Sequence, residues 1–473
     1  MDARVQMLST QADPLTAEHP CRHEVQVVSG YRWHGLYPCT IYGSRFWRRS
    51  LLVGAARRIP LLEFNLGLES NMQRSSSSHS LLSALVNDPY AVYAEMRRLD
   101  QPLFIPHHPG EANRAQGKWL LSTYAQAQAV LADTVHFSKR SADAKGEEAE
   151  AGFDDSMLFQ DDPDHKRLRH LVEGFFRRRA VSSYAEVVRC SSIELLEVME
   201  LNSVIDIVPA YAELLPLSVI ARLIGLPQGE IPLLRDLSRR ITAASDELAV
   251  NDSSLAAKAL AFRQLQQLFQ AGLKGAWRPR EGSLLEALLD AQEAQLLAGN
   301  EAAAMLMLLM FAGHETTIAL IGSCLKLLLN NPDQLSLLHV NPGLIKGAVD
   351  ETLRFESPLQ RSTFRMAIDE VVIGAHRFVS GDQVSVILGS ANRDEKIFTD
   401  ADKFQIDRFP NPHLAFGRGS YHCLGRHLAV MEAEVAVQAF LQHFPRARIS
   451  GEVVWSRNSF IRSLQSLPVL VGA

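Results

Sequence analysis

Apolar positions recur with a helical period along most of the chain from Leu81 onward. Apolar residues three and four positions apart are typical of helices that bury one face. The Asp88-Pro89 pair supplies the cap and first-turn residues expected where a helix begins. Helices are therefore predicted at residues 89–99, 124–132, 164–176, 182–201, 211–224, 231–248, 254–271, 302–330, 344–355 and 425–444.

The longest strongly apolar stretch, Ala302–Gly313, lies in a predicted helix roughly 40 Å long at about 1.5 Å per residue. A membrane-spanning helix needs about 20 mostly apolar residues. Because polar residues follow directly at positions 314–317, we expect a buried core helix and no transmembrane anchor. Asn331-Pro332 is a good terminator for this helix.

The pattern changes to a strand period in the last third of the chain. There, short strands are predicted at residues 365–373, 376–379 and 384–388, with glycines 374 and 381 at turns. Earlier in the chain, a short strand is predicted at residues 119–123 and a polar loop at 141–152. The predicted fold class is mainly α with small β-sheets, built as a single domain over residues 72–473.

Residues 1–71 differ from the rest of the chain. Between Glu24 and Glu63 there are six arginines and no acidic residue, and Met72 is followed by the polar run Ser75–Ser78. Three interpretations are open. The segment is a disordered extension outside the functional protein, an amphipathic membrane-surface segment, or an arginine-rich organelle transit peptide.

Charge and cysteine content restrict the classes of function. A net charge of −5 and a pI near 6.4 give no indication of nucleic-acid binding. The five cysteines include no pair with the close spacing of a zinc ribbon or a redox dithiol. An odd, sparse count fits a reducing compartment, so we expect a cytoplasmic protein without structural disulfides.

The segment Phe416–Gly425 carries the most chemical information. Gly417 and Gly419 permit tight or left-handed turns, and Cys423 stands just before a predicted helix. A helix N-terminus offers free N–H groups and the positive end of the dipole, which lower the pKa of a thiol. Such a thiolate can bind iron. On these residues alone, an ordinary buried cysteine beside a glycine-rich turn is the alternative.

The pattern Phe416-x-x-Gly419-x-x-x-Cys423-x-Gly425 resembles the heme-binding signature of the cytochrome P450 family, and further motifs of that family follow in order from about Asn87 to the C-terminus. The resemblance is to the soluble bacterial type. It implies a P450 fold in which a long central helix lies over heme b and the cysteine loop precedes the last long helix. Cys423 would be the axial iron ligand. The cofactor-binding residues implied in this segment are Phe416, Gly417, Tyr421, Cys423 and Gly425.

Midway along the long helix stands Ala312-Gly313-His314-Glu315-Thr316. A zinc-protease helix would need a second histidine four residues after His314, where isoleucine stands. The segment is similar to the family's acid–alcohol motif, which implies that Ala312 and Gly313 border an oxygen pocket. Thr316 would donate a hydrogen bond to bound dioxygen, and Glu315 would relay protons. The alternative is a helix kink in which the Thr316 hydroxyl bonds to a carbonyl of its own helix.

Two further motifs of the family concern the scaffold. Glu351 and Arg354 are three residues apart on one predicted helix face, which alone would indicate a solvated salt bridge. In this order they resemble the family's Glu-x-x-Arg helix, and Arg408 matches the arginine that completes a buried network. The resemblance implies that the three residues hold the loop leading to Cys423.

Several residues match the family's partners for the heme propionates. His165 and Arg169 are four residues apart on one helix face, and Arg365 follows a predicted turn. One position departs from the pattern: soluble members commonly have histidine or arginine two residues before the cysteine, where this chain has Tyr421. Tyr421 would offer one neutral hydrogen bond and no positive charge. Either Arg365 would then contribute more to propionate binding, or the heme would bind less tightly.

The chain has no strand followed by a Gly-x-Gly-x-x-Gly turn, so we do not expect it to bind a nicotinamide itself. The resemblance implies a separate ferredoxin or flavodoxin with an NAD(P)H reductase. Six arginines are candidates for docking an acidic partner, with an ordinary solvated face as the alternative. They are Arg167, Arg177, Arg178, Arg179, Arg418 and Arg426.

The implied activity is that of a monomeric monooxygenase, which inserts one oxygen atom from O2 into a lipophilic small molecule. Natural-product tailoring is the leading context and catabolism the second. A heme-thiolate isomerase, dehydratase or peroxygenase is the enzymatic alternative, although such enzymes often lack the acid–alcohol pair. A heme-based sensor is the non-enzymatic alternative, and it would be expected to carry an output domain.

Overall fold

The computed structural model describes residues 77–106, 117–140, 154–245 and 251–472. All of them belong to one compact unit, Gln73–Ala473. The predicted extension at residues 1–71 and the predicted loop at residues 141–152 lie outside the described residues.

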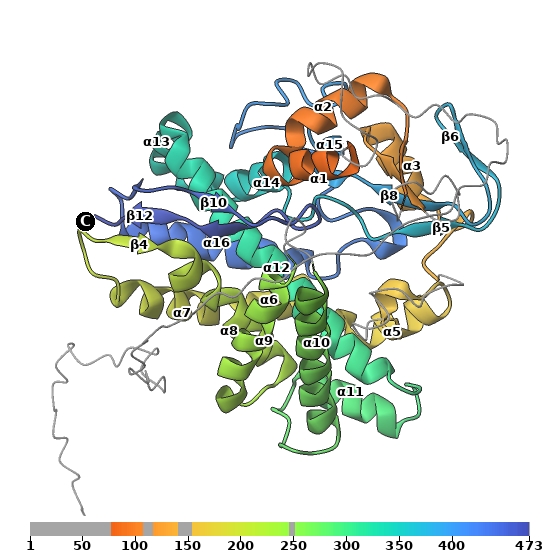
Figure 1. The fold of residues 1–473 in the computed structure, drawn as a ribbon. Helices are drawn as coiled ribbons and strands as arrows, with labels where there is room; N and C mark the ends of the chain where they lie inside the picture. Colours follow the sequence, from red (N-terminus) through yellow and green to blue (C-terminus); the bar gives the residue numbers. More distant parts are fainter. Residues whose placement is uncertain (1–76, 107–116, 141–153, 246–250, 473) are drawn as a thin grey trace, which may run out of the picture. The chain divides into compact units, whose positions relative to one another are not determined.

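The described chain is mainly helical, as predicted (Figure 1). The predicted bounds of α2, α3 and α14 hold to within one residue. The α-helices are α1 Ser77–Asn87, α2 Pro89–Leu99, α3 Tyr124–Ala132, α5 Asp164–Val172, α6 Arg178–Ser182, α7 Ala185–Glu197, α8 Leu214–Ile224, α9 Ile231–Ala243, α10 Asp252–Leu273, α11 Leu284–Glu293, α12 Glu301–Asn330, α13 Pro332–Val340, α14 Ile345–Phe355, α15 Leu388–Ala391 and α16 Arg426–His443. Shorter turns are the π-helical Val208–Ala212 and the 3-10 helices Met157–Phe159, Glu173–Phe176, Gln228–Glu230, Pro342–Leu344 and Gly419–Tyr421.

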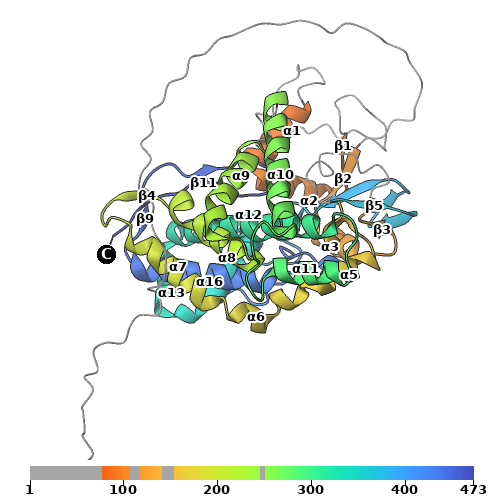
Figure 2. The same ribbon diagram turned by 90° about the horizontal axis from the view of Figure 1, so that it is seen from below.

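The helix α12 is the centre of the helical packing. It contacts α8, α10, α14 and α16. Figure 1 shows α12 among these helices, and Figure 2 shows it again between α8, α10 and α16. Every residue from Ala302 to Met310 is buried, as expected for a helix that is apolar around its circumference. Among the described helices it is the one long and apolar enough to cross a membrane, and 78% of its most apolar window is buried in the protein. Burial of this kind is typical of a core helix.

The strands form four small sheets. The largest has the order β1-β2-β8-β5-β3, in which β2 and β8 are parallel and the other neighbours antiparallel. The strands are β1 Leu103–Pro106, β2 Gly117–Leu121, β3 Phe137–Ser138, β4 Val204–Asp206, β5 Arg365–Ala367, β6 Val371–Ile373, β7 His376–Phe378, β8 Gln383–Val386, β9 Arg448–Ile449, β10 Val454–Trp455, β11 Leu464–Ser466 and β12 Pro468–Leu470.

The structure corrects several sequence-based predictions. Residues 365–373 form two strands in different sheets, separated by a bend at Asp369, whose side chain accepts a hydrogen bond from the Glu370 N–H. The helices α11 and α13 were not predicted, although Ser283 caps α11 by accepting a hydrogen bond from the Glu286 N–H.

Two hydrophobic cores meet at the cysteine segment. One is formed mainly by the helices around α12, and the other lies beneath the largest sheet and α3. Leu414 belongs to the sheet core, whereas Phe416 and Leu424 pack against the helical core. The segment from 414 to 424 is therefore fixed on both sides of Cys423.

Candidate active site

The loop before Cys423 is shaped by two glycines. Gly417 and Gly419 have φ angles of +69° and +75°, in the left-handed region that favours glycine. A Cβ atom on Gly419 would lie 2.9 Å from the Leu131 carbonyl oxygen, so a side chain there is excluded by backbone. The Cys423 N–H donates to the Phe416 carbonyl at 2.9 Å, which closes the loop. Cys423 thus stands just before α16, as predicted.

Opposing effects act on the pKa of Cys423, which is exposed and lines a pocket. Surrounding protein atoms raise the pKa of the thiol, whereas the backbone N–H groups of Gly425 and Arg426 and the positive charge of Arg169 lower it. A coordinated metal ion deprotonates a thiol outright, so a thiolate at Cys423 would be maintained by the metal that it binds.

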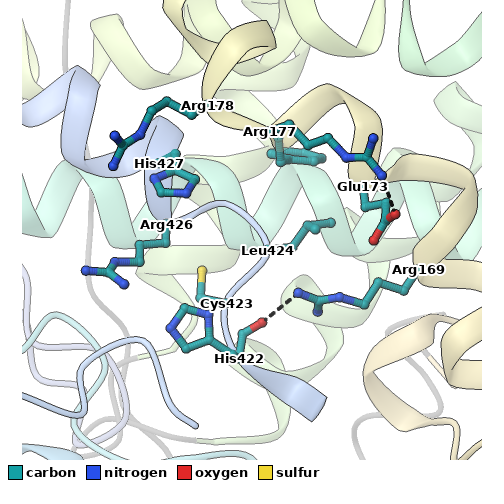
Figure 3. A pocket seen from close by; sticks show the side chains of 10 residues that line it. Arg169, Glu173, Arg177, Arg178, His422, Cys423, Leu424, Arg426 and His427 are labelled. Atoms are coloured by element: carbon teal, nitrogen blue, oxygen red, sulfur yellow. Dashed lines mark hydrogen bonds and ion pairs between the residues drawn. The ribbon is translucent and has the colours of Figure 1, made fainter. Parts of the chain in front are cut away.

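A basic pocket of about 320 Å³ opens beside the cysteine. Figure 3 shows four arginines around it. Arg169 is on α5, Arg177 directly precedes α6, Arg178 is the first residue of α6 and Arg426 is the first residue of α16. Glu173 is the acidic residue in the lining, and Arg177 binds it at 2.8 Å. The pocket therefore keeps a positive charge.

Arg169 connects α5 to the cysteine segment directly. Its Nη2 donates to the His422 carbonyl at 3.0 Å. Gly425 caps α16, and the guanidinium of Arg426 lies 5.7 Å from the centre of the Phe416 ring. These contacts bring the predicted residues 169, 416, 423 and 425 together in one place.

Arg365 presents buried hydrogen-bond donors that no described residue satisfies. Its side chain is 2% exposed, and its Nη2 donates to the Leu131 carbonyl at 3.3 Å. The Nε and Nη1 donors have no hydrogen-bond partner among the described residues. Buried charged donors of this kind carry a large free-energy cost unless an anion binds them. An anionic group such as a carboxylate of heme therefore fits this position.

Tyr421, two residues before the cysteine, is hydrogen-bonded within the protein. Its hydroxyl donates to the Gln160 carbonyl at 2.8 Å and lies 3.1 Å from Asp161, so it is already engaged within the protein. Burial, followed by the charge of Asp161, raises its pKa. Its ring lies 4.3 Å from the His165 ring and 5.0 Å from the Arg365 guanidinium. Tyr421 thus packs between the side chains of His165 and Arg365, while its hydroxyl is bound by Gln160 and Asp161.

Lys139 also belongs to this cluster and was not identified from the sequence. Its side chain is buried, and its Nζ lies 5.6 Å from the Tyr421 ring centre. It hydrogen-bonds to the Thr363 hydroxyl and to the Phe364 carbonyl, the latter at 3.0 Å. No local pattern marks Lys139, because these contacts join segments more than 200 residues apart.

The acid–alcohol segment lies in the middle of α12, and its residues face different neighbours. Ala312 is exposed although the helix around it is mostly buried, and the Thr316 hydroxyl donates to its carbonyl at 2.9 Å. Gly313 faces α8 instead, since a Cβ atom there would lie 2.9 Å from Ile220. Gly313 therefore permits close helix packing. Ala312 is exposed and Thr316 is half-buried, and these two residues are called the accessible stripe of α12.

Glu315 turns toward α9 and away from this stripe. Its Oε1 accepts hydrogen bonds from the Ser238 hydroxyl at 3.0 Å and the Thr242 hydroxyl at 2.6 Å. His314 lies next to it with the Nδ1 atom 3.9 Å from the same oxygen, and burial lowers the pKa of this imidazole. The two hydroxyls on α9 were not identified from the sequence.

The predicted framework residues form one buried network. Glu351 and Arg354 are fully buried and joined by two hydrogen bonds of 2.8 Å. The Arg408 Nε reaches both Glu351 oxygens at 3.1 Å. Asn411, in the segment that leads to the cysteine, also donates to Glu351 at 3.2 Å. The solvated salt bridge that the spacing alone would indicate is excluded by this burial.

The predicted basic residues do not all share one face. Arg177, Arg178 and Arg426 line the pocket beside Cys423, and Arg418 lines an adjoining pocket of about 280 Å³. Arg167 binds Glu301 and Asp164, so its charge is compensated.

The comparisons with known proteins agree with this arrangement. A sequence model of the family described as Cytochrome P450 matches residues 343–464. The chain is 33% identical to the biotin biosynthesis cytochrome P450 of Bacillus subtilis, over 83% of this chain and 98% of the relative. It is 34% identical to the cytochrome P450 monooxygenase PikC of Streptomyces venezuelae, over 81% and 91% respectively.

Solved structures give the same result. A myxobacterial cytochrome P450 in complex with myristic acid superposes with a TM-score of 0.74 at 30% identity, covering 83% of this chain and 98% of that one. The tirandamycin C-bound monooxygenase TamI superposes with a TM-score of 0.73 at 31% identity, covering 82% and 99%.

Proposed function

This chain belongs to the cytochrome P450 family, and we propose that Cys423 is the axial thiolate ligand of its heme iron. The family binds heme b, and the chain is a heme-dependent monooxygenase. Two observations together support the site assignment. The loop before Cys423 is closed by a backbone hydrogen bond, and Arg365 has buried N–H donors that lack a partner among the described residues. The relatives are named as monooxygenases and hydroxylases, so the isomerase, dehydratase and peroxygenase alternatives are not favoured.

Bound heme supplies the chemistry that activates O2 and inserts one of its oxygen atoms into the substrate. The residues around Cys423 bind and orient the group. Arg365, His165 and Arg169 are proposed to bind its carboxylates, with Lys139 adding a fourth basic side chain to the same cluster. Phe416, Gly417 and Gly425 shape the loop on the cysteine side.

Glu315 and Thr316 are proposed to move protons on the other side of the site. The Thr316 hydroxyl is on the accessible stripe of α12 and holds its proton toward the Ala312 carbonyl. Glu315 is the titratable group adjacent to it, and its carboxylate must turn from α9 to serve Thr316 directly or through one water.

The network of Glu351, Arg354 and Arg408 is proposed to hold the cysteine segment in place. Support comes from Asn411 and from the Asn392 side chain, which accepts the Leu414 N–H at 2.6 Å just before the loop. These residues act through the backbone and do not contact the reacting atoms.

Electrons reach the site from separate redox partners, which we propose to be a ferredoxin or flavodoxin and its NAD(P)H reductase. The pocket lined by Arg177, Arg178 and Arg426 beside Cys423 suits an acidic protein. We further propose a monomer in the cytoplasm, where NAD(P)H-dependent reductases operate.

The substrate is proposed to be a lipophilic small molecule in natural-product tailoring. Phe311 on α12, partly buried and 5.2 Å from the Phe262 ring of α10, provides an apolar surface near the accessible stripe. Relatives include the 6-deoxyerythronolide B hydroxylase of Saccharopolyspora erythraea, at 33% identity. A structural relative holds myristic acid, so fatty acids are suitable first probes.

The Cys423 assignment is tested by electron paramagnetic resonance of heme-loaded Cys423→Ser and Cys324→Ala. Cys324 is the matched control, because it is a free cysteine buried in α12. We expect the low-spin signal of thiolate ligation to persist in Cys324→Ala and to disappear in Cys423→Ser. Persistence of this signal in Cys423→Ser would overturn the assignment.

A further inference from the structure

The carboxylate of Glu315 is held by hydroxyl groups of a different helix. Ser238 and Thr242 are four residues apart on α9, so their side chains lie on one face of the helix. Both donate to the same oxygen, Oε1, at 3.0 and 2.6 Å. The hydroxyl of the adjacent Thr316 bonds to its own helix instead. The direction of the Glu315 side chain is therefore set by contacts with α9 and not by the Thr316 hydroxyl.

The two hydroxyls differ in their access to solvent. Ser238 is 3% exposed and Glu315 is 8% exposed, whereas Thr242 is exposed near the end of α9. A hydroxyl can accept a proton from water with one lone pair while it donates its own proton. Thr242 can therefore connect solvent with the buried Glu315 carboxylate. Ser238 is itself buried, so it can only hold that carboxylate in place.

The charged groups around Glu315 do not offer an equivalent route. His314 is buried, and burial lowers its pKa, which favours the neutral imidazole. Glu213 on the neighbouring segment is engaged by Arg235 and Arg239 of α9, at 3.1 and 2.6 Å. These ion pairs join α9 to the residue before α8. Thr242 is the α9 hydroxyl that has both an accessible position and a short hydrogen bond to Glu315.

We propose that Thr242 is the residue through which solvent protons reach Glu315, with Ser238 as a positioning residue. The Thr242 hydroxyl passes its proton to the Glu315 carboxylate and takes one from water, so Thr242 is unchanged after each transfer. The proposal rests on the relay role of Glu315 proposed above. It adds the path by which Glu315 regains a proton from solvent, and it assigns that path to a residue of α9.

Proton supply decides how O2 is reduced when no substrate is present. Two electrons and two protons convert O2 into hydrogen peroxide, whereas four electrons and four protons convert it into two waters. A slow proton supply therefore increases the share of O2 released as peroxide. This share can be measured with NADPH, a plant-type ferredoxin and its reductase, without an identified substrate.

The variants are Thr242→Val, which removes the hydroxyl at nearly constant volume, and Thr242→Ser, which keeps it. Ser245→Ala is the matched control, because that hydroxyl is also on the end of α9 but bonds to the Ile241 carbonyl of the same helix. Each variant is first checked for full heme content. Peroxide release per O2 and the rate of NADPH oxidation are then compared in H2O and D2O.

We expect Thr242→Val to raise the peroxide share about threefold or more and to enlarge the solvent isotope effect, since general acid catalysis typically contributes far larger factors. Thr242→Ser and Ser245→Ala should match the wild type. A structural role alone would not change the isotope effect.

Glu315→Gln separates this inference from the function on which it rests. If Glu315→Gln raises the peroxide share but Thr242→Val does not, the Thr242 path is overturned and the role of Glu315 stands. If Glu315→Gln has no effect, the relay role itself is wrong and the Thr242 path falls with it.

Discussion

Replacing Glu351 by glutamine should destabilise the protein more than any exposed charge change. The substitution keeps the shape of the side chain but removes the one negative charge shared by Arg354 and Arg408. Glu351 and Arg354 are 0% exposed, and the Arg408 side chain is 8% exposed, so water cannot compensate the two guanidinium groups. Loss of one partner from a buried ionic network typically costs about 3–5 kcal/mol.

The chain contains a matched control for this prediction. Glu95 and Arg98 on α2 have the same three-residue spacing and two hydrogen bonds of 2.9 and 2.6 Å, but they are 39% and 69% exposed. Exposed pairs contribute about 0–1 kcal/mol. Glu95→Gln should therefore shift the urea midpoint of unfolding far less than Glu351→Gln does.

Urea unfolding of the heme-loaded proteins, followed by heme absorbance and by tryptophan fluorescence, measures both effects. Glu351→Gln should also bind less heme, because Asn411 and the segment leading to Cys423 lose their anchor. Equal stability of Glu351→Gln and Glu95→Gln would show that the network does not support the site as described.

Three other predictions concern the cofactor, the partner and pH. Arg365→Leu should lose heme to an acceptor protein about tenfold faster or more, as expected for loss of about 1.5–3 kcal/mol from a charge-assisted hydrogen bond. An unchanged rate of heme transfer would contradict the proposal that the Arg365 side chain binds a heme carboxylate. Arg178→Glu should slow reduction by an acidic ferredoxin at low ionic strength and lose this effect in high salt, whereas a salt-independent effect would argue against docking beside Cys423. Burial lowers the pKa of His314 in the folded protein, so the unfolded chain binds a proton at this residue more readily. The free energy of unfolding should therefore fall as the pH drops below about 6.5, by at most about 1.4 kcal/mol per pH unit. His314→Asn should show a shallower loss in urea titrations at several pH values, and an identical slope would refute the assignment.

The sequence predicted the features that depend on local chain geometry. The glycines before Cys423, the i, i+3 spacing of Glu351 and Arg354, and the bounds of α2 and α14 are all determined within a few residues. Motifs of this kind are readable because backbone conformation and helix faces follow directly from residue type and spacing.

The features that the sequence did not predict are contacts between distant segments. Lys139, which follows β3, contacts Thr363, which precedes the neighbouring strand β5. Ser238 and Thr242 of α9 contact Glu315 of α12. Gly313 packs against Ile220 of α8, a contact that periodicity does not predict.

The most direct test of the central claim is the carbon monoxide difference spectrum of the reduced protein. Thiolate ligation by Cys423 predicts a Soret band at the far-red position characteristic of heme-thiolate proteins, and loss of that band in Cys423→Ser. A band at the position of histidine- or thiol-ligated heme in the wild-type protein would contradict the claim that Cys423 binds the iron as a thiolate.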